Sequence, residues 1–219
     1  MLTDIALPDD ETLTREGLAA ARSGRVLVLA CGALAREILA LTQSNGLEHI
    51  DLHCLPAILH NHPERIVPAV EEAVAIYRAV YDTIFLAYAD CGTGGLLQAK
   101  AEALGLKMLA GPHCYAFFEG SEGFVERADN EFTAFYLTDF LVRQFDAFVW
   151  TPLGLDRHPE LRDTYFGHYE SLVYQAQTDD AALTALAQDA AARLGLTFER
   201  RFTGYGDLAT AIDELRDLS

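Results

Sequence analysis

Three of the four cysteines in this sequence follow short apolar runs. Cys31 follows "VLVLA", Cys91 follows "FLAYAD" and Cys114 follows "MLAGPH". Thiolates are soft ligands for zinc and iron–sulfur clusters, and they are also nucleophiles. The residue types therefore point to thiol chemistry, provided that the fold brings these three side chains together.

The apolar runs are typical of buried strands. We predict strands over 25–30, 50–55, 83–88 and 107–110, separated by helix-like stretches. This alternation predicts an α/β fold, Rossmann-like and doubly wound, with a mostly parallel sheet flanked by helices. In open α/β sheets, ligands bind beyond the carboxyl ends of the strands. Because three cysteines follow such ends, we expect their thiols to point into one crevice.

Three converging thiols would suit zinc, or alternatively an iron–sulfur cluster, once they are deprotonated. We therefore predict Cys31, Cys91 and Cys114 as metal ligands. The alternative is that each is a plain core or turn residue, because free cysteine is among the most buried residue types. The spacing alone does not decide, since no pair of cysteines has the C-x-x-C spacing of a local metal knuckle.

The histidines after the second predicted strand add candidate ligands and bases. His60 and His62 lie in the loop "ILHNHPER", at the same end of the sheet as the cysteines. Imidazole can ligate a metal or act as a general base. We predict His60 as the fourth metal ligand and His62 as a base; the alternative for His62 is a helix-entry position before Pro63. Cys54 is interpreted as structural.

The turn "CGTGG" contributes backbone flexibility beside Cys91. Gly92 and Gly94 permit close backbone approach or positive φ, and we predict that they contact the cofactor. The turn matches neither the G-x-G-x-x-G fingerprint nor a P-loop, so no nucleotide site is predicted. Asp90 is predicted as a catalytic base or as an acceptor for a ligand histidine, with a helix cap as the alternative.

The rest of the chain is predicted to be largely helical. We treat residues 1–219 as a single domain, in which 130–219 could form a C-terminal helical annex. The predicted helices cover 12–22, 33–43, 63–81, 95–104, 132–145, 166–177, 179–194 and 207–218, and a last strand covers 196–202.

Composition excludes several classes of function. The 219 residues carry a formal net charge of −17, which argues against nonspecific nucleic-acid binding and against an anionic membrane surface. No apolar run reaches the length of a membrane span, and the N-terminus is acidic where a secretory signal would be basic. We therefore expect a cytoplasmic protein, and in a reducing compartment the cysteines are expected as thiols or ligands.

The segments "LACGALAREI", "LHNHPERI", "YADCGTGGL", "GPHCYAFFEG" and "YFGHYESLVY" together resemble a family of bacterial and archaeal proteins classed as a domain of unknown function (DUF1638-like). The resemblance covers about residues 25–177. The family pattern of a cysteine after the first strand, a "GLHxxP" loop, a "Y-x-x-C-G-x-G" turn and an "HDC" segment maps onto Cys31, His60, Cys91 and Cys114. Here "GPHC" replaces "HDC", and His62 replaces other residues.

The resemblance implies a role beside corrinoid proteins and methyltransferase subunits. Members of the family are commonly encoded beside such partners, and some serve split forms of cobalamin-dependent methionine synthase. The implied function is corrinoid-dependent methyl transfer, as a methyltransferase component or as an accessory protein. No D-x-H-x-x-G run is present, so the chain itself is not expected to carry the cobalamin.

Two other classes of function remain open from the residues. One is a metal-dependent hydrolase or lyase that acts on a small molecule, with His62 or Asp90 as the base. The other is a non-catalytic chaperone or scaffold in which the cysteines are structural. The sequence leaves the metal, the substrate and the oligomeric state undetermined.

Overall fold

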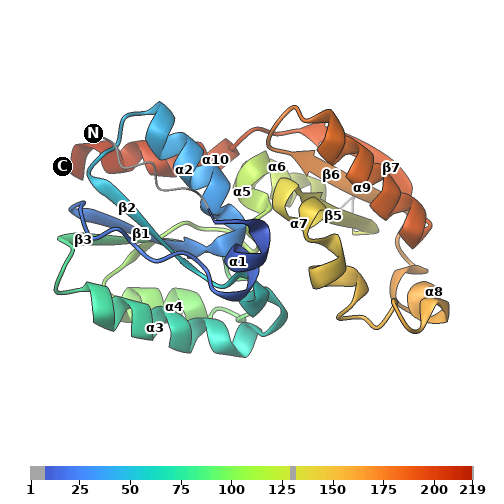
Figure 1. Ribbon diagram of the computed structural model, residues 1–219, viewed down its shortest axis with the longest axis horizontal. Helices are drawn as coiled ribbons and strands as arrows, with labels where there is room; N and C mark the ends of the chain where they lie inside the picture. Colours follow the sequence, from blue (N-terminus) through green and yellow to red (C-terminus); the bar gives the residue numbers. More distant parts are fainter. Residues whose placement is uncertain (1–7, 129–131, 219) are drawn as a thin grey trace. The chain divides into compact units, whose positions relative to one another are not determined.

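The computed structural model describes residues 8–128 and 132–218 and has an α/β fold, as predicted. The chain divides into two compact units (Figure 1). The first unit runs up to Cys114 and takes in the C-terminal stretch from Leu208, and the second spans Tyr115–Asp207. Each unit has a parallel sheet of its own. The predicted single domain and the predicted annex over 130–219 stay predictions.

The sheet of the first unit has the strand order β2-β1-β3-β4, and all its strand pairs are parallel. Val26 lies opposite Ile50 on one side and Thr83 on the other. Every residue of the central strand β1 is buried, as expected for a strand covered on both faces. The four predicted strands are confirmed as β1 (Val26–Cys31), β2 (Ile50–Leu55), β3 (Thr83–Ala87) and β4 (Lys107–Met108).

The order of these strands creates a topological switch point between β1 and β3. From β1 the chain moves outward to β2, and it then returns to the other side of β1 to form β3. Figure 1 shows helices on both faces of this sheet, with α2 and α10 on one face and α3 and α4 on the other. A switch point of this kind opens a crevice at the carboxyl ends of the two strands. The helices are α2 (Ala35–Ser44), α3 (Ile66–Tyr77), α4 (Leu96–Leu104) and α10 (Gly206–Asp213).

Short 3-10 turns replace parts of the predicted helices and loops. The helix predicted from residue 63 begins as the turn η3 (Pro63–Arg65), and the loop before it contains η2 (Ala57–Asn61). The helix predicted from residue 33 follows η1 (Gly32–Leu34), directly after Cys31. The last predicted helix is α10 followed by η6 (Glu214–Leu218).

The first helix, α1 (Asp10–Arg15), is shorter than the predicted 12–22. Asp9 caps it by accepting a hydrogen bond from the backbone N–H of Thr12. Gly17 ends it with φ of +81° and lies so close to β2 that a Cβ there would meet the carbonyl oxygen of Cys54 at 2.0 Å. Leu18 then exchanges two backbone hydrogen bonds with Cys54. Pairing with the edge of the sheet therefore outweighs the helical pattern of this segment.

The second unit contains a three-stranded parallel sheet in the order β5-β6-β7. The helices predicted over 132–145 and 166–177 are therefore wrong where they cover β5 (Ala134–Thr138) and β6 (Ser171–Ala176). Periodicity does not separate short apolar runs in strands from those in buried helices. The last predicted strand is confirmed as β7 (Thr197–Phe202). The helices are α5 (Ala116–Glu119), α6 (Ser121–Ala128), α7 (Asp139–Arg143), α8 (Arg162–Phe166) and α9 (Ala181–Leu194), with a π-helical turn η4 (Asp146–Trp150) and a 3-10 turn η5 (Pro159–Leu161).

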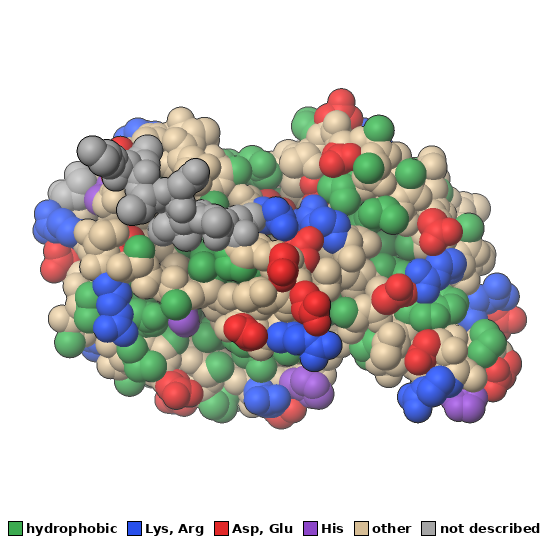
Figure 2. All heavy atoms as spheres, viewed as in Figure 1, with side chains coloured by type: hydrophobic (Ala, Val, Ile, Leu, Met, Phe, Trp, Pro, Cys, Tyr) green, Lys and Arg blue, Asp and Glu red, His purple; other side chains and the backbone are tan. Residues whose placement is uncertain are grey.

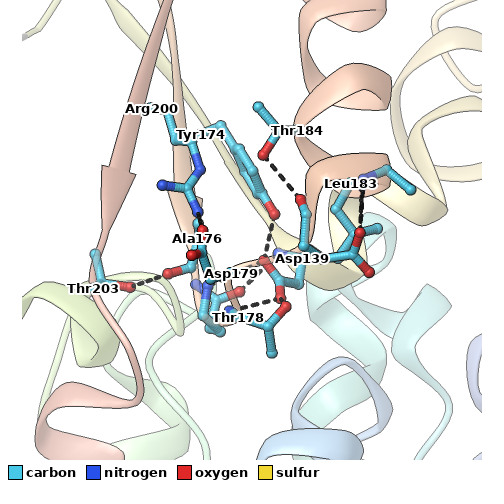
Figure 3. A network of polar contacts seen from close by, with 12 residues as sticks. Asp139, Tyr174, Ala176, Thr178, Asp179, Leu183, Thr184, Arg200 and Thr203 are labelled. Carbon is cyan, nitrogen blue, oxygen red and sulfur yellow. Dashed lines mark hydrogen bonds and ion pairs between the residues drawn. The ribbon is translucent and has the colours of Figure 1, made fainter.

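A buried carboxylate organises the carboxyl edge of this second sheet (Figure 3). Asp139, which is 2% exposed, follows β5 and accepts a hydrogen bond from the Tyr174 hydroxyl at 2.7 Å. It also accepts from the backbone N–H of Gln177 at 3.1 Å and from the Thr178 hydroxyl at 2.6 Å. A buried charge is tolerated only when its hydrogen bonds are made, and here they join the ends of β5 and β6.

Figure 2 shows how charged side chains are distributed on one face of the molecule. On the face drawn in Figure 2, acidic and basic side chains are interspersed, and no broad basic area is visible among the described residues. Among the described helices, none has both the length and the apolar character that crossing a membrane requires.

Candidate functional site: a thiol cluster at the switch point

A cluster of thiols lies beyond the carboxyl ends of the strands of the first sheet. Cys31 is the last residue of β1, Cys91 lies in the turn after β3, and Cys114 lies in the loop after β4. The Sγ atoms of Cys91 and Cys114 lie 3.3 Å apart, within hydrogen-bonding distance for two sulfurs. All four cysteines are free thiols. The sequence prediction that these strand-end cysteines converge is thus confirmed for Cys91 and Cys114.

Backbone contacts hold these two cysteines together. The N–H of Asp90 donates to the carbonyl of Gly111, and the N–H of Cys91 donates to the carbonyl of Pro112, both at 3.1 Å. These bonds continue the β3–β4 pairing beyond the ends of the strands. Cys91 itself has φ of +46°, in the left-handed region that side chains other than glycine rarely adopt. Strained backbone of this kind is found at functional sites more often than elsewhere.

Asp90 fixes the turn that carries Cys91. Its carboxylate accepts hydrogen bonds from the Thr93 hydroxyl at 2.7 Å and from the backbone N–H groups of Gly94 and Gly95 at 3.0 and 2.7 Å. Although burial opposes ionisation, these hydrogen bonds lower the pKa of Asp90. A carboxylate that is stabilised in this way is a weak base, so its contacts favour the capping alternative; its predicted catalytic role stays a prediction.

The glycines of the turn differ in their surroundings. Gly92 has φ of +82°, and a Cβ on it would lie 3.3 Å from the side chain of Pro63. Gly94 has φ of +64° and open space around it. Gly92 therefore lets the turn approach the loop that carries the histidines, whereas the cofactor contact predicted for both glycines stays a prediction.

The pKa values of the two paired thiols are shifted in opposite directions. A hydrogen bond from Cys114 is the main cause that lowers the pKa of Cys91 to about 5; burial opposes this shift, and His60 adds to it. The same hydrogen bond, together with burial, raises the pKa of the Cys114 thiol well above its usual range. Near neutral pH, the pair is therefore a Cys91 thiolate that accepts a hydrogen bond from a Cys114 thiol.

Cys31 and Tyr88 form the buried side of the cluster. Burial is the main cause that raises the pKa of Cys31 to about 12, and the negative charge of Cys91 adds to it. Tyr88 is 1% exposed, and its hydroxyl has no hydrogen-bond partner among the described residues. Burial raises the pKa of Tyr88, and interactions with Cys31, Cys114 and Cys91 raise it further. The Tyr88 hydroxyl thus lies beside three sulfurs, and its interaction with Cys31 acts against the rise in the pKa of that thiol.

The other predicted residues lie at or near this cluster. His60 is an exposed residue of η2, and its interaction with Cys91 brings it to the site. His62 is exposed, with its Nδ1 3.8 Å from a carboxylate oxygen of Glu64. Cys54, which was interpreted as structural, is 1% exposed within β2. The roles of His60 as a ligand and His62 as a base stay predictions.

Two features of the site went unassigned in the sequence. His113 is half-buried, and burial lowers its pKa, which keeps the imidazole neutral beside the thiols. Tyr88 was seen only as part of an apolar run. Its place three residues before Cys91, at the end of a buried strand, is the one signal that could have drawn attention to it.

The structure contains no preformed metal site within the described ranges. No three His, Cys, Asp or Glu side chains there are grouped so that they could hold a metal ion. The chemistry of the donors nevertheless fits a soft metal. Tetrahedral zinc with bonds of about 2.3 Å separates two thiolates by about 3.8 Å, close to the 3.3 Å between Cys91 and Cys114. A metal would require Cys31 or His60 to turn toward this pair.

Comparison with protein families supports the resemblance seen in the sequence. Residues 54–212, more than half of the chain, match the family described as protein of unknown function, DUF1638. The chain belongs to this family. The matched region includes His60, Cys91 and Cys114, whereas Cys31 lies before it. No curated protein and no solved structure matched the chain.

Proposed function

We propose that this DUF1638 protein binds a soft metal ion, zinc in the first place and an iron–sulfur cluster as the alternative, at Cys91 and Cys114. One observation carries the proposal: the two sulfurs lie 3.3 Å apart beyond the carboxyl ends of a sheet with a topological switch point. Cys31 and His60 are the proposed further ligands. Bound zinc would supply Lewis acidity and keep a thiolate nucleophilic while holding it in place.

The protein's own residues prepare this site. The lowered pKa of Cys91 provides a thiolate near neutral pH, which removes the need to displace a proton from the first ligand. The turn held by Asp90 fixes the backbone of Cys91 and limits the entropy lost on binding. Cys31, which is 5% exposed, lies on the buried side of the site. Four free thiols agree with a cytoplasmic location, which we include in the proposal.

The wider role that we propose is corrinoid-dependent methyl transfer, as a component or accessory of a split methionine-synthase-like system. Membership of the family supports this role only through the resemblance described above, because the family description itself names no activity. The proposed partners are a corrinoid protein and methyltransferase subunits. A thiolate site is suited to methyl transfer, since sulfur is both a good methyl acceptor and a soft metal ligand.

Metal analysis tests the site. Wild-type protein purified without oxygen is expected to contain close to one equivalent of zinc, or iron with acid-labile sulfide. Cys91→Ser and Cys114→Ser should lose the metal, whereas Cys54→Ser, at a buried cysteine of β2, should keep it. Less than about a tenth of an equivalent of zinc plus iron in the wild type, after incubation with either metal, would overturn the proposal.

Deletion of the gene from its native host tests the wider role. The deletion strain is expected to require methionine, and wild-type protein should restore growth where Cys91→Ser does not. Growth of the deletion strain without methionine would remove the methyl-transfer role while leaving the metal site intact.

A further inference from the structure

The distance between Cys91 and Cys114 has a second chemical consequence, which does not require a metal. A disulfide has an S–S bond of about 2.0 Å, so the observed 3.3 Å must shorten by little more than one ångström. Rotation about the side-chain torsions can supply such a movement. The backbone hydrogen bond from Cys91 to Pro112 keeps the two segments in place meanwhile.

The surroundings of the pair select small oxidants. Cys91 is only 5% exposed, whereas its neighbour Gly92 and the facing Pro112 are exposed, and Cys114 is partly exposed. Hydrogen peroxide is about the size of two waters, so it is small enough to approach a sulfur that is partly exposed, as Cys114 is. A bulky disulfide such as oxidised glutathione cannot align its own S–S bond with a sulfur that is buried to this degree.

We propose that Cys91 and Cys114 form a peroxide-reactive dithiol, which closes to a disulfide when it meets hydrogen peroxide or a small hydroperoxide. One thiol attacks a peroxide oxygen, the O–O bond breaks, and water leaves, so that this cysteine becomes a sulfenic acid. The second thiol attacks that sulfur, the S–O bond breaks, and a second water leaves. The two sulfurs lose two electrons in total, and the peroxide gains them.

The proximity of the sulfurs decides the second step. Whichever cysteine reacts first, its partner lies within 3.3 Å, so the disulfide closes before a second peroxide can oxidise the sulfenic acid further. The remaining thiols are buried to similar degrees, with Cys31 at 5% and Cys54 at 1% exposed. Burial alone therefore does not separate Cys91 from these two residues, whereas Cys114 is more exposed than either. The experiment must show which sulfurs join.

Peptide mapping identifies the bond directly in the wild-type protein. Cleavage after Arg and Lys places the four cysteines in four separate peptides, with Cys91 in residues 79–100 and Cys114 in residues 108–127. After treatment of metal-free protein with hydrogen peroxide and blocking of free thiols, these two peptides are expected to be linked. The link should form about tenfold faster than Cys54 is modified, and oxidised glutathione at equal concentration should form it more slowly.

Single variants identify the intermediate. Cys91→Ser should accumulate a sulfenic acid on Cys114, and Cys114→Ser should accumulate one on Cys91, each trapped by dimedone; Cys54→Ser should form the disulfide like the wild type. A link to Cys31, or oxidation of the pair no faster than that of Cys54, would overturn the inference. Because the wild-type mapping requires no variant, a folding defect in a variant does not affect it.

The dithiol and the metal site can fail independently. A disulfide in a protein that binds no metal would support the dithiol and reject the metal site. Metal binding without a peroxide-induced disulfide would support the metal site and reject the dithiol. If both hold, zinc should protect the pair from peroxide, because the same sulfurs cannot ligate the metal and bond to each other.

Discussion

The two units place polar side chains at the same position of a parallel sheet and use them differently. In the second unit, Asp139 follows β5 and its carboxylate accepts hydrogen bonds from the Tyr174 hydroxyl, Gln177 and Thr178. In the first unit, Cys91 follows β3, and its Sγ lies 3.3 Å from the Sγ of Cys114 and also interacts with His60. Both residues are buried.

The two clusters also differ in how their buried tyrosine hydroxyls are paired. The hydroxyl of Tyr174 donates to Asp139 at 2.7 Å, whereas the equally buried hydroxyl of Tyr88 has no partner among the described residues. Polar groups whose hydrogen bonds are all made stabilise the fold, and those left unpaired mark sites that await a ligand or a reaction. The carboxyl edge of a parallel sheet therefore predicts where polar groups gather. Pairing alone does not tell what they do, because the buried side-chain amide of Gln175 in β6 also has no partner among the described residues.

The largest effect is expected in the second unit. Asp139→Ala leaves the Tyr174 hydroxyl and the N–H of Gln177 without an acceptor, so it should lower the free energy of unfolding by about 3 kcal/mol. Denaturant unfolding followed by circular dichroism measures this. The control Asp189→Ala, at an exposed position of α9, should change stability by less than about 0.5 kcal/mol. A similarly small loss of stability in Asp139→Ala would show that the hydrogen bonds of Asp139 do not stabilise the second unit.

The second effect concerns the acidity of Cys91. Because the hydrogen bond from Cys114 is the main cause that lowers the pKa of Cys91 to about 5, Cys114→Ala should move it toward the ordinary 9.0. Thiolate absorbance of metal-free protein titrated with pH measures the shift, with Cys54→Ala as the control that keeps the low value. An unchanged titration in Cys114→Ala would show that the pair is not coupled.

The lowered pKa of Cys91 also determines how the free energy of unfolding changes with pH. The pKa of Cys91 is lower in the folded chain than the 9.0 of a free thiol, so between about pH 5 and pH 9 unfolding takes up a proton. The free energy of unfolding of the wild type, relative to Cys91→Ala, should therefore rise with pH across that range. The contribution is fully present above pH 9 and is lost as pH falls through 5.

The smallest expected effect is the difference in unfolding free energy between variants of the two buried tyrosines. Tyr174→Phe removes a donor to a buried carboxylate and should cost about 1.5 kcal/mol of unfolding free energy. Tyr88→Phe removes a hydroxyl that has no hydrogen-bond partner within the described part of the chain, so stability should stay unchanged or rise by about 1 kcal/mol. Denaturant unfolding of both variants beside the wild type measures the difference. Equal losses would show that Tyr88 is a structural donor after all.

Much of the first unit could be predicted from the sequence. A strand that is covered on both faces of a parallel sheet is an unbroken apolar run, so "VLVLAC" and "TIFLA" were recognisable as β1 and β3. The strand ends then placed Cys31, Cys91 and Cys114 at one edge. The sequence could not separate strand from helix in the second unit, because "AFYLT" and "SLVYQA" are short, apolar and aromatic, and such runs fit both.

The sequence by itself thus determined the α/β class, the first sheet and the edge at which the cysteines gather, because these follow from local patterns of apolar residues. Only the tertiary structure decided that Cys91 and Cys114 lie 3.3 Å apart and that the pKa of Cys91 is lowered. It also decided that the buried Tyr88 hydroxyl has no hydrogen-bond partner among the residues that the structure describes. Distances, burial and hydrogen bonds between residues far apart in the chain depend on how β3, β4 and their loops pack. No local pattern records that packing.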